Sequence, residues 1–414
     1  MAKLAFESLE FRESKDNKEI IEVSLLKNFF FQISKEDLNR IGTFRIGDKF
    51  IEFKDIDEKQ LSRASSRFNS LIAEGIRNLK NRLNGKPAVY VHRNSGIPLI
   101  GSLFFGIVDR ATSIIEVKPL TSCNINCVFC SVDEGISSRK QSDFVVEEEY
   151  LVEELRKILD YKSADESCIE VFINPHGEPL LYADIVKLVK DIKAIRQVKK
   201  VSIATNGSLL TEKLVDELDS AGLDSLNISV NSLDDKNARI MAGTKEYDIK
   251  KIKKTMDYIA SKTKIKIILA PVWVKGMNDK DIEDIIDYCK KKDFEIGIQK
   301  YVEHKKGRHP KGAKDVEWGK FFEELQAMQE KHNSKLVYPC GPKKTRELPR
   351  PFSTGDTINA IIVSEGRYND EKIAAAKGRI ITVYDCNKGK KTGSPVKIKI
   401  IKSKDNIFFG KCAS

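Results

Sequence analysis

The chain has 414 residues, 41% hydrophobic content and a net charge of +11. These values predict two or three folded domains and exclude a disordered protein. The longest apolar tract, Ile97 to Val108, is about half of a membrane crossing. The amino terminus carries charges where a signal peptide would need an apolar core. We therefore expect no membrane association and a cytoplasmic protein whose cysteines stay reduced.

Residues 1–112 are predicted to form a small α+β domain. One helical stretch near Ser62–Leu83 is surrounded by strand-like, β-branched or aromatic runs. These runs are Ile20–Leu26, Phe29–Ile33, Lys49–Phe53 and Ala88–His92. The domain contains no cysteine, and its pattern indicates no function.

Residues 113–340 are predicted to form the core, because apolar β-branched runs alternate there with amphipathic helical patterns. The strands are expected at Ile114–Leu120, Cys168–Asn174, Val201–Thr205, Leu226–Val230, Lys264–Trp273 and Phe294–Tyr301. The helices are expected at Glu147–Ser163, Ala183–Arg196, Thr211–Ala221, Asp248–Thr263, Asp279–Lys292 and Val316–His332. Six such βα units predict an α/β fold with parallel strands, a partial (β/α)6 TIM-like barrel with one side open.

Three cysteines follow the first core strand directly, at Cys123, Cys127 and Cys130. Three thiolates at this spacing can hold three corners of a cubic iron–sulfur cluster, whose ligands are normally four cysteines, and so leave one iron open to a small molecule. A zinc site would need a fourth Cys or His, and the nearest, Cys168 and His176, lie far along the chain, so that only a structure can exclude them. A disulfide fits poorly, because three is an odd number.

The spacing Cys-x3-Cys-x2-Cys, with Phe129 before the last cysteine, resembles the signature of the radical S-adenosylmethionine (SAM) superfamily. The resemblance implies a [4Fe–4S] cluster on the three cysteines, with SAM chelated at the open iron. It also implies one-electron cleavage of SAM to a 5′-deoxyadenosyl radical, which removes a hydrogen atom from the substrate. A ferredoxin or flavodoxin-type protein would donate the electron.

The same resemblance extends to the ends of later strands. His176-Gly177-Glu178-Pro179 is similar to a Gly-Gly-Glu-Pro motif that binds the methionyl amino group, although His176 departs from it. Gly177 suits a close backbone approach to a ligand. His176 either caps the strand or faces the substrate.

Further cofactor contacts are expected at the third, fourth and sixth strands. Thr205 and Asn206 either touch the cofactor or only form a turn with the glycine that follows. By resemblance, Ser229 and Asn231 bind the ribose hydroxyls. Gln299 either reaches the adenine or closes the barrel rim, and Phe129 packs on the adenine or within its loop.

The other five cysteines, Cys168, Cys289, Cys340, Cys386 and Cys412, form no pairs at ligand spacing, which argues against an auxiliary cluster. Cys340 lies just past the barrel and could reach its active site, but a structural role is the simpler expectation. Two basic loops, 137–140 and 301–312, lie near the predicted site. Each is either solvated or a phosphate contact.

Residues 350–414 follow a proline-flanked linker and are predicted to form a small β-barrel. Strands are expected at Thr357–Val363, Gly378–Tyr384, Val396–Ile401 and Ile407–Gly410. The pattern resembles a TRAM domain, an oligonucleotide-fold-like barrel found on RNA-modifying enzymes. The alternative is a basic barrel that only packs on the core.

Most of the positive charge belongs to this end of the chain. Residues 341–414 carry 16 Lys and Arg against 7 Asp and Glu, a net +9, which leaves +2 for the first 340 residues. Such a local basic module favours a polyanionic partner. The expected RNA contacts are Lys343, Lys344, Arg346, Arg379, Lys388, Lys390, Lys391, Lys397, Lys399, Lys402 and Lys404.

Three functions remain open at this point. The first is a radical SAM enzyme that modifies a nucleotide in RNA, with tRNA as the expected class. The second is a radical SAM enzyme that acts on a protein, a peptide or a metabolite. The third is an RNA-binding protein with a structural cluster, which would need neither the 176–179 motif nor Ser229 and Asn231.

Overall fold

The computed structural model describes residues 2–54, 56, 58–162, 169–338, 341–386 and 389–413. Cys168, Cys340 and Lys388 lie outside these ranges. The chain forms two compact units, Met1–Val91 with Gln141–Val145, and His92–Lys140 with Val146–Ser414. The division into domains 1–112, 113–340 and 350–414 stays a prediction. None of the described helices is long and apolar enough to cross a bilayer.

The first unit is an antiparallel α+β structure in which β1-β6-β5 form one sheet, β2-β3-β4-β7 a second, and β8 pairs with β11. Its strands are β1 (Ala2–Ala5), β2 (Leu9–Glu13), β3 (Ile20–Leu25), β4 (Phe29–Ser34), β5 (Phe44–Gly47), β6 (Phe50–Phe53), β7 (Lys80–Asn81), β8 (Ala88–Val91) and β11 (Asp143–Val146). Its helices are α1 (Lys35–Asn39) and α2 (Glu58–Arg77). The predicted helix over 62–83 was placed too late: α2 begins at Glu58 and ends at Arg77, and residues 80–81 pair with β4 instead.

The second unit contains the predicted parallel sheet, in the order β17-β15-β14-β13-β12-β10-β9. The six parallel strands are β10 (Ile114–Lys118), β12 (Ile169–Ile173), β13 (Val198–Thr205), β14 (Ser225–Ile228), β15 (Lys266–Leu269) and β17 (Glu295–Ile296). An unpredicted strand, β9 (Gly106–Asp109), pairs antiparallel with β10 at the edge. Six parallel strands in sequence order confirm the partial (β/α)6 fold.

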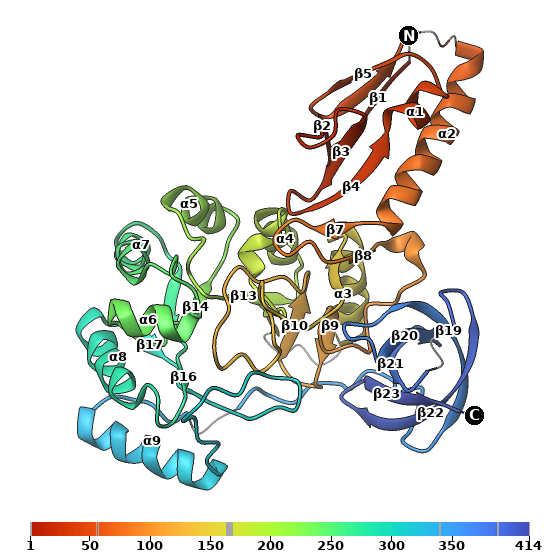
Figure 1. Ribbon diagram of the computed structural model, residues 1–414. Coiled ribbons are helices and arrows are strands. Elements are labelled where there is room, and N and C mark those ends of the chain that lie inside the picture. Colours follow the sequence, from red (N-terminus) through yellow and green to blue (C-terminus); the bar gives the residue numbers. More distant parts are fainter. Residues whose placement is uncertain are drawn as a thin grey trace. The chain divides into compact units, whose positions relative to one another are not determined.

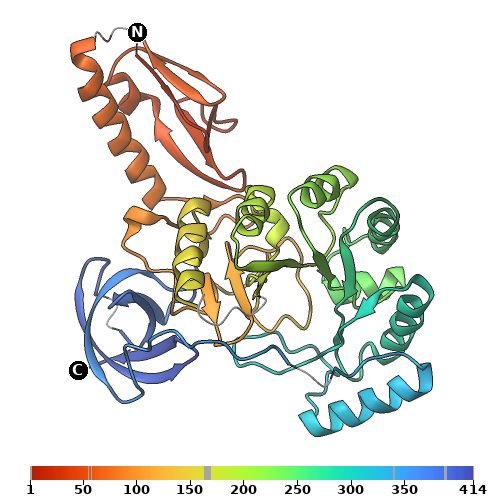
Figure 2. The ribbon, with the colours of Figure 1, turned by 180° about the vertical axis from the view of Figure 1, so that it is seen from behind.

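The helices of this unit lie along the outer side of the strands (Figures 1 and 2). They are α3 (Glu148–Lys162), α4 (Ile185–Lys193), α5 (Glu212–Ser220), α6 (Asp235–Ala242), α7 (Ile249–Lys262), α8 (Asp279–Lys292) and α9 (Trp318–His332). Thr211 is the N-cap of α5, because its hydroxyl accepts the Leu214 amide. Helix α6 was missed, since its eight residues make barely two turns, although Asp234 caps it and Gly243 ends it.

The last two predicted core strands are each broken in two. Strand β15 is followed by β16 (Val272–Trp273), and β17 by β18 (Gln299–Lys300). Strands β16 and β18 pair with each other, parallel, outside the main sheet. This short pair brings Gln299 to the carboxyl end of the sheet, where loops of parallel barrels carry their functional groups.

A closed five-stranded barrel follows, in the order β19-β20-β21-β23-β22. Its strands are β19 (Thr357–Glu365), β20 (Glu371–Ala376), β21 (Arg379–Tyr384), β22 (Pro395–Lys404) and β23 (Ile407–Cys412). The predicted barrel is confirmed with one strand more than expected. Strand β20 was missed because its composition favours a helix, and pairing with β19 and β21 overrides that preference.

A disulfide joins Cys386 and Cys412 at one end of the barrel. The two cysteines are 26 residues apart in sequence, and they meet because β21 and β23 are parallel neighbours with Tyr384 opposite Lys411. The expectation that the cysteines stay reduced is therefore wrong for this pair. The pairing was not predicted, since it depends on this parallel register.

The barrel is joined to the segment that precedes β9 by backbone hydrogen bonds. The Ile380 amide donates to the Ile100 carbonyl at 2.8 Å, and the Phe408 amide donates to the Gly101 carbonyl at 3.2 Å. Gly101 has φ +125°, and a Cβ there would lie 2.2 Å from the Ile380 carbonyl oxygen. Only glycine fits this position.

Gly101→Ala is expected to lower the thermal midpoint of unfolding, because it adds both a backbone clash and a strain of roughly 1–3 kcal/mol. Gly319→Ala in α9 is the matched control, since nothing lies within 4 Å of its Cβ position. Circular dichroism melts of the two variants check this. An unchanged midpoint for Gly101→Ala would contradict the proposed fit.

Candidate active site

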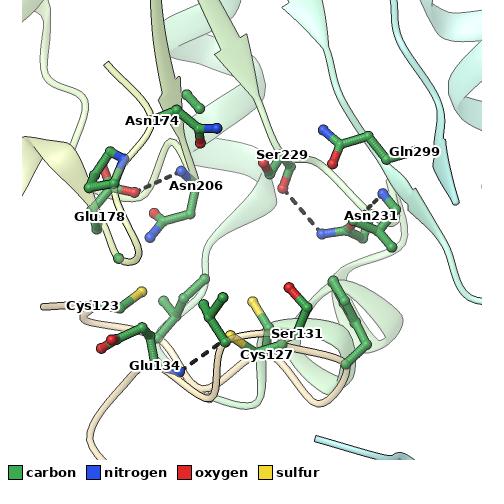
Figure 3. A pocket seen from close by; sticks show the side chains of 18 of the residues that line it. Cys123, Cys127, Ser131, Glu134, Asn174, Glu178, Asn206, Ser229, Asn231 and Gln299 are labelled. Carbon is green, nitrogen blue, oxygen red and sulfur yellow. Dashed lines mark hydrogen bonds between the residues drawn. The ribbon is translucent and has the colours of Figure 1, made fainter. Parts of the chain in front are cut away.

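A cavity of about 400 Å³ lies at the carboxyl ends of the core strands, a volume suited to a small-molecule ligand. In Figure 3, Cys123 and Cys127 lie on one side of it, and Glu178, Asn206, Ser229 and Asn231 lie across from them. All of the expected cluster and cofactor residues except Pro179 line it: Cys123, Cys127, Phe129, Cys130, Gly177, Glu178, Thr205, Asn206, Ser229, Asn231 and Gln299. Buried Pro179 instead starts the short 3-10 helix η3 (Pro179–Leu181).

The cysteine loop, residues 121–134, supplies three thiols that are not in disulfides. Burial, together with repulsion between neighbouring thiolates, raises the pKa of Cys123 well above its usual value and that of Cys127 to about 12. Bound iron would remove this penalty, because it compensates the thiolate charge. The Glu134 amide donates to Cys130 Sγ at 3.3 Å, a contact typical of cluster-binding sulfurs.

The single-zinc alternative named Cys168 and His176 as candidates for a fourth ligand, and Cys168 lies outside the described residues. His176 does not line the cavity, and its Nδ1 lies 3.4 Å from an Arg367 nitrogen. Burial lowers the pKa of His176 well below its usual value, and nearby Lys118, Arg367 and Lys140 lower it further.

Two loops from neighbouring strands touch through their backbones. Gly177 has φ +151°, and a Cβ there would lie 2.2 Å from the Ser122 carbonyl oxygen. The Glu178 amide donates to the same oxygen at 2.7 Å. The close approach predicted for Gly177 is therefore made to Ser122, next to the first cysteine.

Glu178 is a buried carboxylate with three donors. The Thr205 hydroxyl donates to it at 2.7 Å, the Asn206 amide at 2.8 Å and the Leu180 amide at 3.0 Å. Burial raises its pKa to about 7, and these hydrogen bonds limit the rise. Thr205 and the Asn206 backbone thus orient Glu178, while the Asn206 side chain bonds Asn124 in the cysteine loop at 3.0 Å.

The fourth and sixth strands complete the opposite wall. The Asn231 side chain donates to the Ser229 carbonyl at 3.3 Å and accepts the Val272 amide at 2.8 Å, which fixes its orientation. Exposed Gln299 lines both this cavity and a neighbouring one. Ser229 and Asn231 present their side chains to the cavity as expected for residues at i and i+2 of a strand end.

Several lining residues were missed by the sequence analysis. They are Ser131, Glu134, Asn174, Lys300 and His304. Asn174 had a signal, since it ends the second core strand just before the 176–179 motif. Glu134 had none, because its place depends on long-range contacts that no local pattern encodes.

The two basic loops near the site are largely bound within the protein. Lys306 pairs with Glu371 at 2.7 Å and with Asp370 at 3.2 Å. Arg308 pairs with Asp133 at 2.9 Å and donates to the Cys127 carbonyl at 3.0 Å. The expected phosphate contact is therefore not favoured for these two side chains.

The second basic loop, residues 137–140, shows the same pattern. Arg139 pairs with Asp133 at 3.0 Å, and fully buried Lys140 pairs with Glu134. Carboxylates therefore hold Lys306, Arg308, Arg139 and Lys140. Lys305 and Lys311 of the 301–312 loop are exposed.

The expected RNA contacts fall into two groups. Arg346 stacks on Tyr161 at 4.0 Å, and Arg379 donates to the Pro349 carbonyl at 2.9 Å, so both serve the fold. Lys390 is half-buried and donates to the Pro395 carbonyl at 3.4 Å. Arg346 is nevertheless exposed, and the exposed lysines of the set are Lys343, Lys344, Lys391, Lys397, Lys399, Lys402 and Lys404.

The sequence and the fold are similar to those of known proteins. Residues 117–289 match the Radical SAM superfamily. Uncharacterized protein MJ0103 of Methanocaldococcus jannaschii is 33% identical over 96% of this chain and 95% of that protein. GTP 3′,8-cyclase of Clostridium botulinum is 34% identical over 44% of this chain and 54% of that enzyme, so the match spans about half of it. A solved structure of TYW1 with a lysine-pyruvate adduct aligns at 23% identity and a TM-score of 0.39, covering 55% of this chain and 76% of that one.

Gly177→Ala is expected to reduce the iron bound after anaerobic reconstitution severalfold, because the new Cβ displaces Ser122 and with it Cys123. Gly297→Ala is the control, since its Cβ position is open. Iron and sulfide analysis checks this. Full iron loading of Gly177→Ala would contradict the expected coupling of the two loops.

The affinity for SAM is expected to fall about tenfold from pH 8 to pH 6, since the ionised fraction of a carboxyl with a pKa of about 7 falls by that factor. The ionised form is the one that accepts hydrogen bonds from the methionyl amino group. Equilibrium dialysis of reconstituted protein measures it. Glu178→Gln should bind weakly and without this pH dependence, and an identical dependence in the variant would assign it to another group.

Proposed function

Because the chain belongs to the radical SAM superfamily, we propose that it is a radical SAM enzyme that modifies a nucleotide in RNA, with tRNA as the expected class. Enzymes of this superfamily use a [4Fe–4S] cluster and SAM and need an electron donor. We assign that donor to a ferredoxin or flavodoxin-type protein. Together, cluster and SAM supply a carbon radical that can abstract a hydrogen atom from an unactivated position. The expected cytoplasmic location stays a prediction.

The residues around the cavity would bind the cluster and SAM. Cys123, Cys127 and Cys130 hold the cluster, and Glu178 accepts the methionyl amino group. Ser229 and Asn231 bind the ribose, and the other lining residues, with Pro179 behind them, shape the pocket. Thr205 acts through Glu178, to which it donates at 2.7 Å.

The outer surface of β22 in the C-terminal barrel is the proposed binding surface for RNA. On β22, the exposed residues Lys397 and Lys399 alternate with buried residues, so both lysines point out of the barrel. A bulge near Ile401 then shifts the register by one residue. Lys402 and Lys404 therefore keep the same outward direction. We call these four side chains the lysine row. All four are exposed, and no ion pair involves them within the described ranges.

Aromatic rings continue this surface toward the cavity. Lys402 lies over Phe409 at 5.9 Å, and Phe409 stacks on Tyr384 with centroids 6.0 Å apart and planes 4° apart. Lys306 lies over Tyr384 at 5.4 Å, two residues beyond His304 of the cavity wall. The exposed lysine row beside the rings of Phe409 and Tyr384 suits a nucleic acid, because phosphates pair with lysine and bases stack on rings. Lys306 is already held by Glu371 and Asp370 and is not counted among the phosphate contacts. The TRAM resemblance points the same way.

The alternative substrate is a protein, a peptide or a metabolite. GTP 3′,8-cyclase is named for action on GTP, so a free nucleotide belongs among the metabolites to test. A purely structural cluster is the least favoured reading, because a structural role needs no cavity beside the three thiols.

Neutralising the lysine row is expected to abolish the effect of RNA on SAM cleavage. The variant carries Lys397→Gln, Lys399→Gln, Lys402→Gln and Lys404→Gln. The control carries the same change at four exposed lysines of α7 and α8: Lys250, Lys251, Lys254 and Lys291. Only the first variant should flatten the salt dependence of RNA binding, by up to about one unit of log–log slope per lysine.

The readouts are RNA filter binding at several salt concentrations and 5′-deoxyadenosine formation with total RNA, RNase-treated RNA or GTP. Stimulation by RNA that RNase and the lysine-row variant both abolish supports the proposal. Cleavage that ignores RNA, or equal losses in both variants, would overturn it and move the search to proteins and metabolites.

A further inference from the structure

The turn between β19 and β20, residues 366–370, places an arginine of the C-terminal barrel against the cysteine loop. Arg367 is buried, with 6% of its side chain exposed. Its guanidinium donates to a Glu134 carboxylate oxygen at 2.6 Å and to the Val132 carbonyl at 2.9 Å. The same group lies 3.4 Å from His176 Nδ1, in the motif that follows β12.

Glu134 links Arg367 to both ends of the cysteine loop through its own hydrogen bonds and ion pair. Its amide donates to Cys130 Sγ at 3.3 Å. Its carboxylate pairs with Lys140, whose ammonium donates to the Thr121 carbonyl at 2.6 Å. The loop has no helix or strand of its own between residues 121 and 134, so these contacts determine its shape.

Arg367 and Lys140 place two buried positive charges beside the cysteine loop, both paired with the Glu134 carboxylate. Asp133, the other buried carboxylate of this loop, pairs with Arg308 and Arg139. Charges in a low-dielectric interior act strongly on neighbouring groups. Hydrogen bonds to sulfur and nearby positive charge both favour the reduced state of an iron–sulfur cluster, which has gained one electron and one negative charge.

We propose that Arg367 is a positioning residue for the cluster. It holds Glu134 so that the Glu134 amide stays on Cys130, and its charge raises the reduction potential. The C-terminal barrel is then part of the redox site as well as a candidate RNA-binding surface. This inference does not depend on the substrate.

The test is a redox titration of reconstituted enzyme without RNA, followed by electron paramagnetic resonance of the reduced cluster. In Arg367→Met the potential should shift to more negative values and the spectrum should change, while iron content stays near that of the parent. Arg367→Lys keeps the charge and should shift less. Arg379→Met is the matched control, since this half-buried barrel arginine donates to barrel and linker carbonyls, and it should leave the potential unchanged.

Glu134→Gln distinguishes an effect of charge on the cluster from an effect of a loosened cysteine loop. It keeps the amide that donates to Cys130 but removes the negative charge, so the potential should shift to less negative values. Shifts of the same sign in Arg367→Met and Glu134→Gln, or a shift in Arg379→Met equal to that in Arg367→Met, would overturn the proposal. Arg367→Lys replaces Arg367→Met in this test if the latter does not fold. In that case, unchanged reduction potentials in both Arg367→Lys and Glu134→Gln would overturn the proposal. Failure of the RNA proposal changes none of these readings, because no RNA is present.

Discussion

The backbone contact between Ser122 and the Gly177–Glu178 pair is the constraint on which the site depends. It ties the start of the cysteine loop to the end of β12 without any side chain, through one carbonyl oxygen that accepts the Glu178 amide at 2.7 Å. Because Glu178 is bound in turn to Thr205 and Asn206, three successive strand ends share one network. The cavity is therefore positioned by the parallel sheet itself, as parallel barrels usually arrange their sites.

The far end of the cysteine loop is held by side chains instead. Arg308, from the chain that leaves the last core strands, and Arg367, from the C-terminal barrel, both reach residues 127–134. Arginine suits this task because its planar group makes several hydrogen bonds in fixed directions. A loop that must hold a metal cluster thus acquires rigidity from segments far away in sequence.

The core and most of the cavity could be predicted because their signals are local. Strand periodicity, the spacing of Cys123, Cys127 and Cys130, and polar residues at strand ends all follow from the order of neighbouring residues. The rest depends on pairing between distant segments. Strand β20, the disulfide between Cys386 and Cys412, the ion pairs of Lys306 and the burial of Arg367 follow from tertiary contacts that override composition.

The glycine contact between Gly101 and Ile380 has a consequence for protein engineering. A small C-terminal barrel is a natural choice for exchange between proteins, but here its β21 and β23 hydrogen-bond to the backbone of Ile100 and Gly101. A transplanted barrel would need the same acceptor segment on its new host. Conversely, if a foreign barrel replaced the present one, the Ile100 and Gly101 carbonyls would lose their donors. The barrel and this segment therefore have to be moved together.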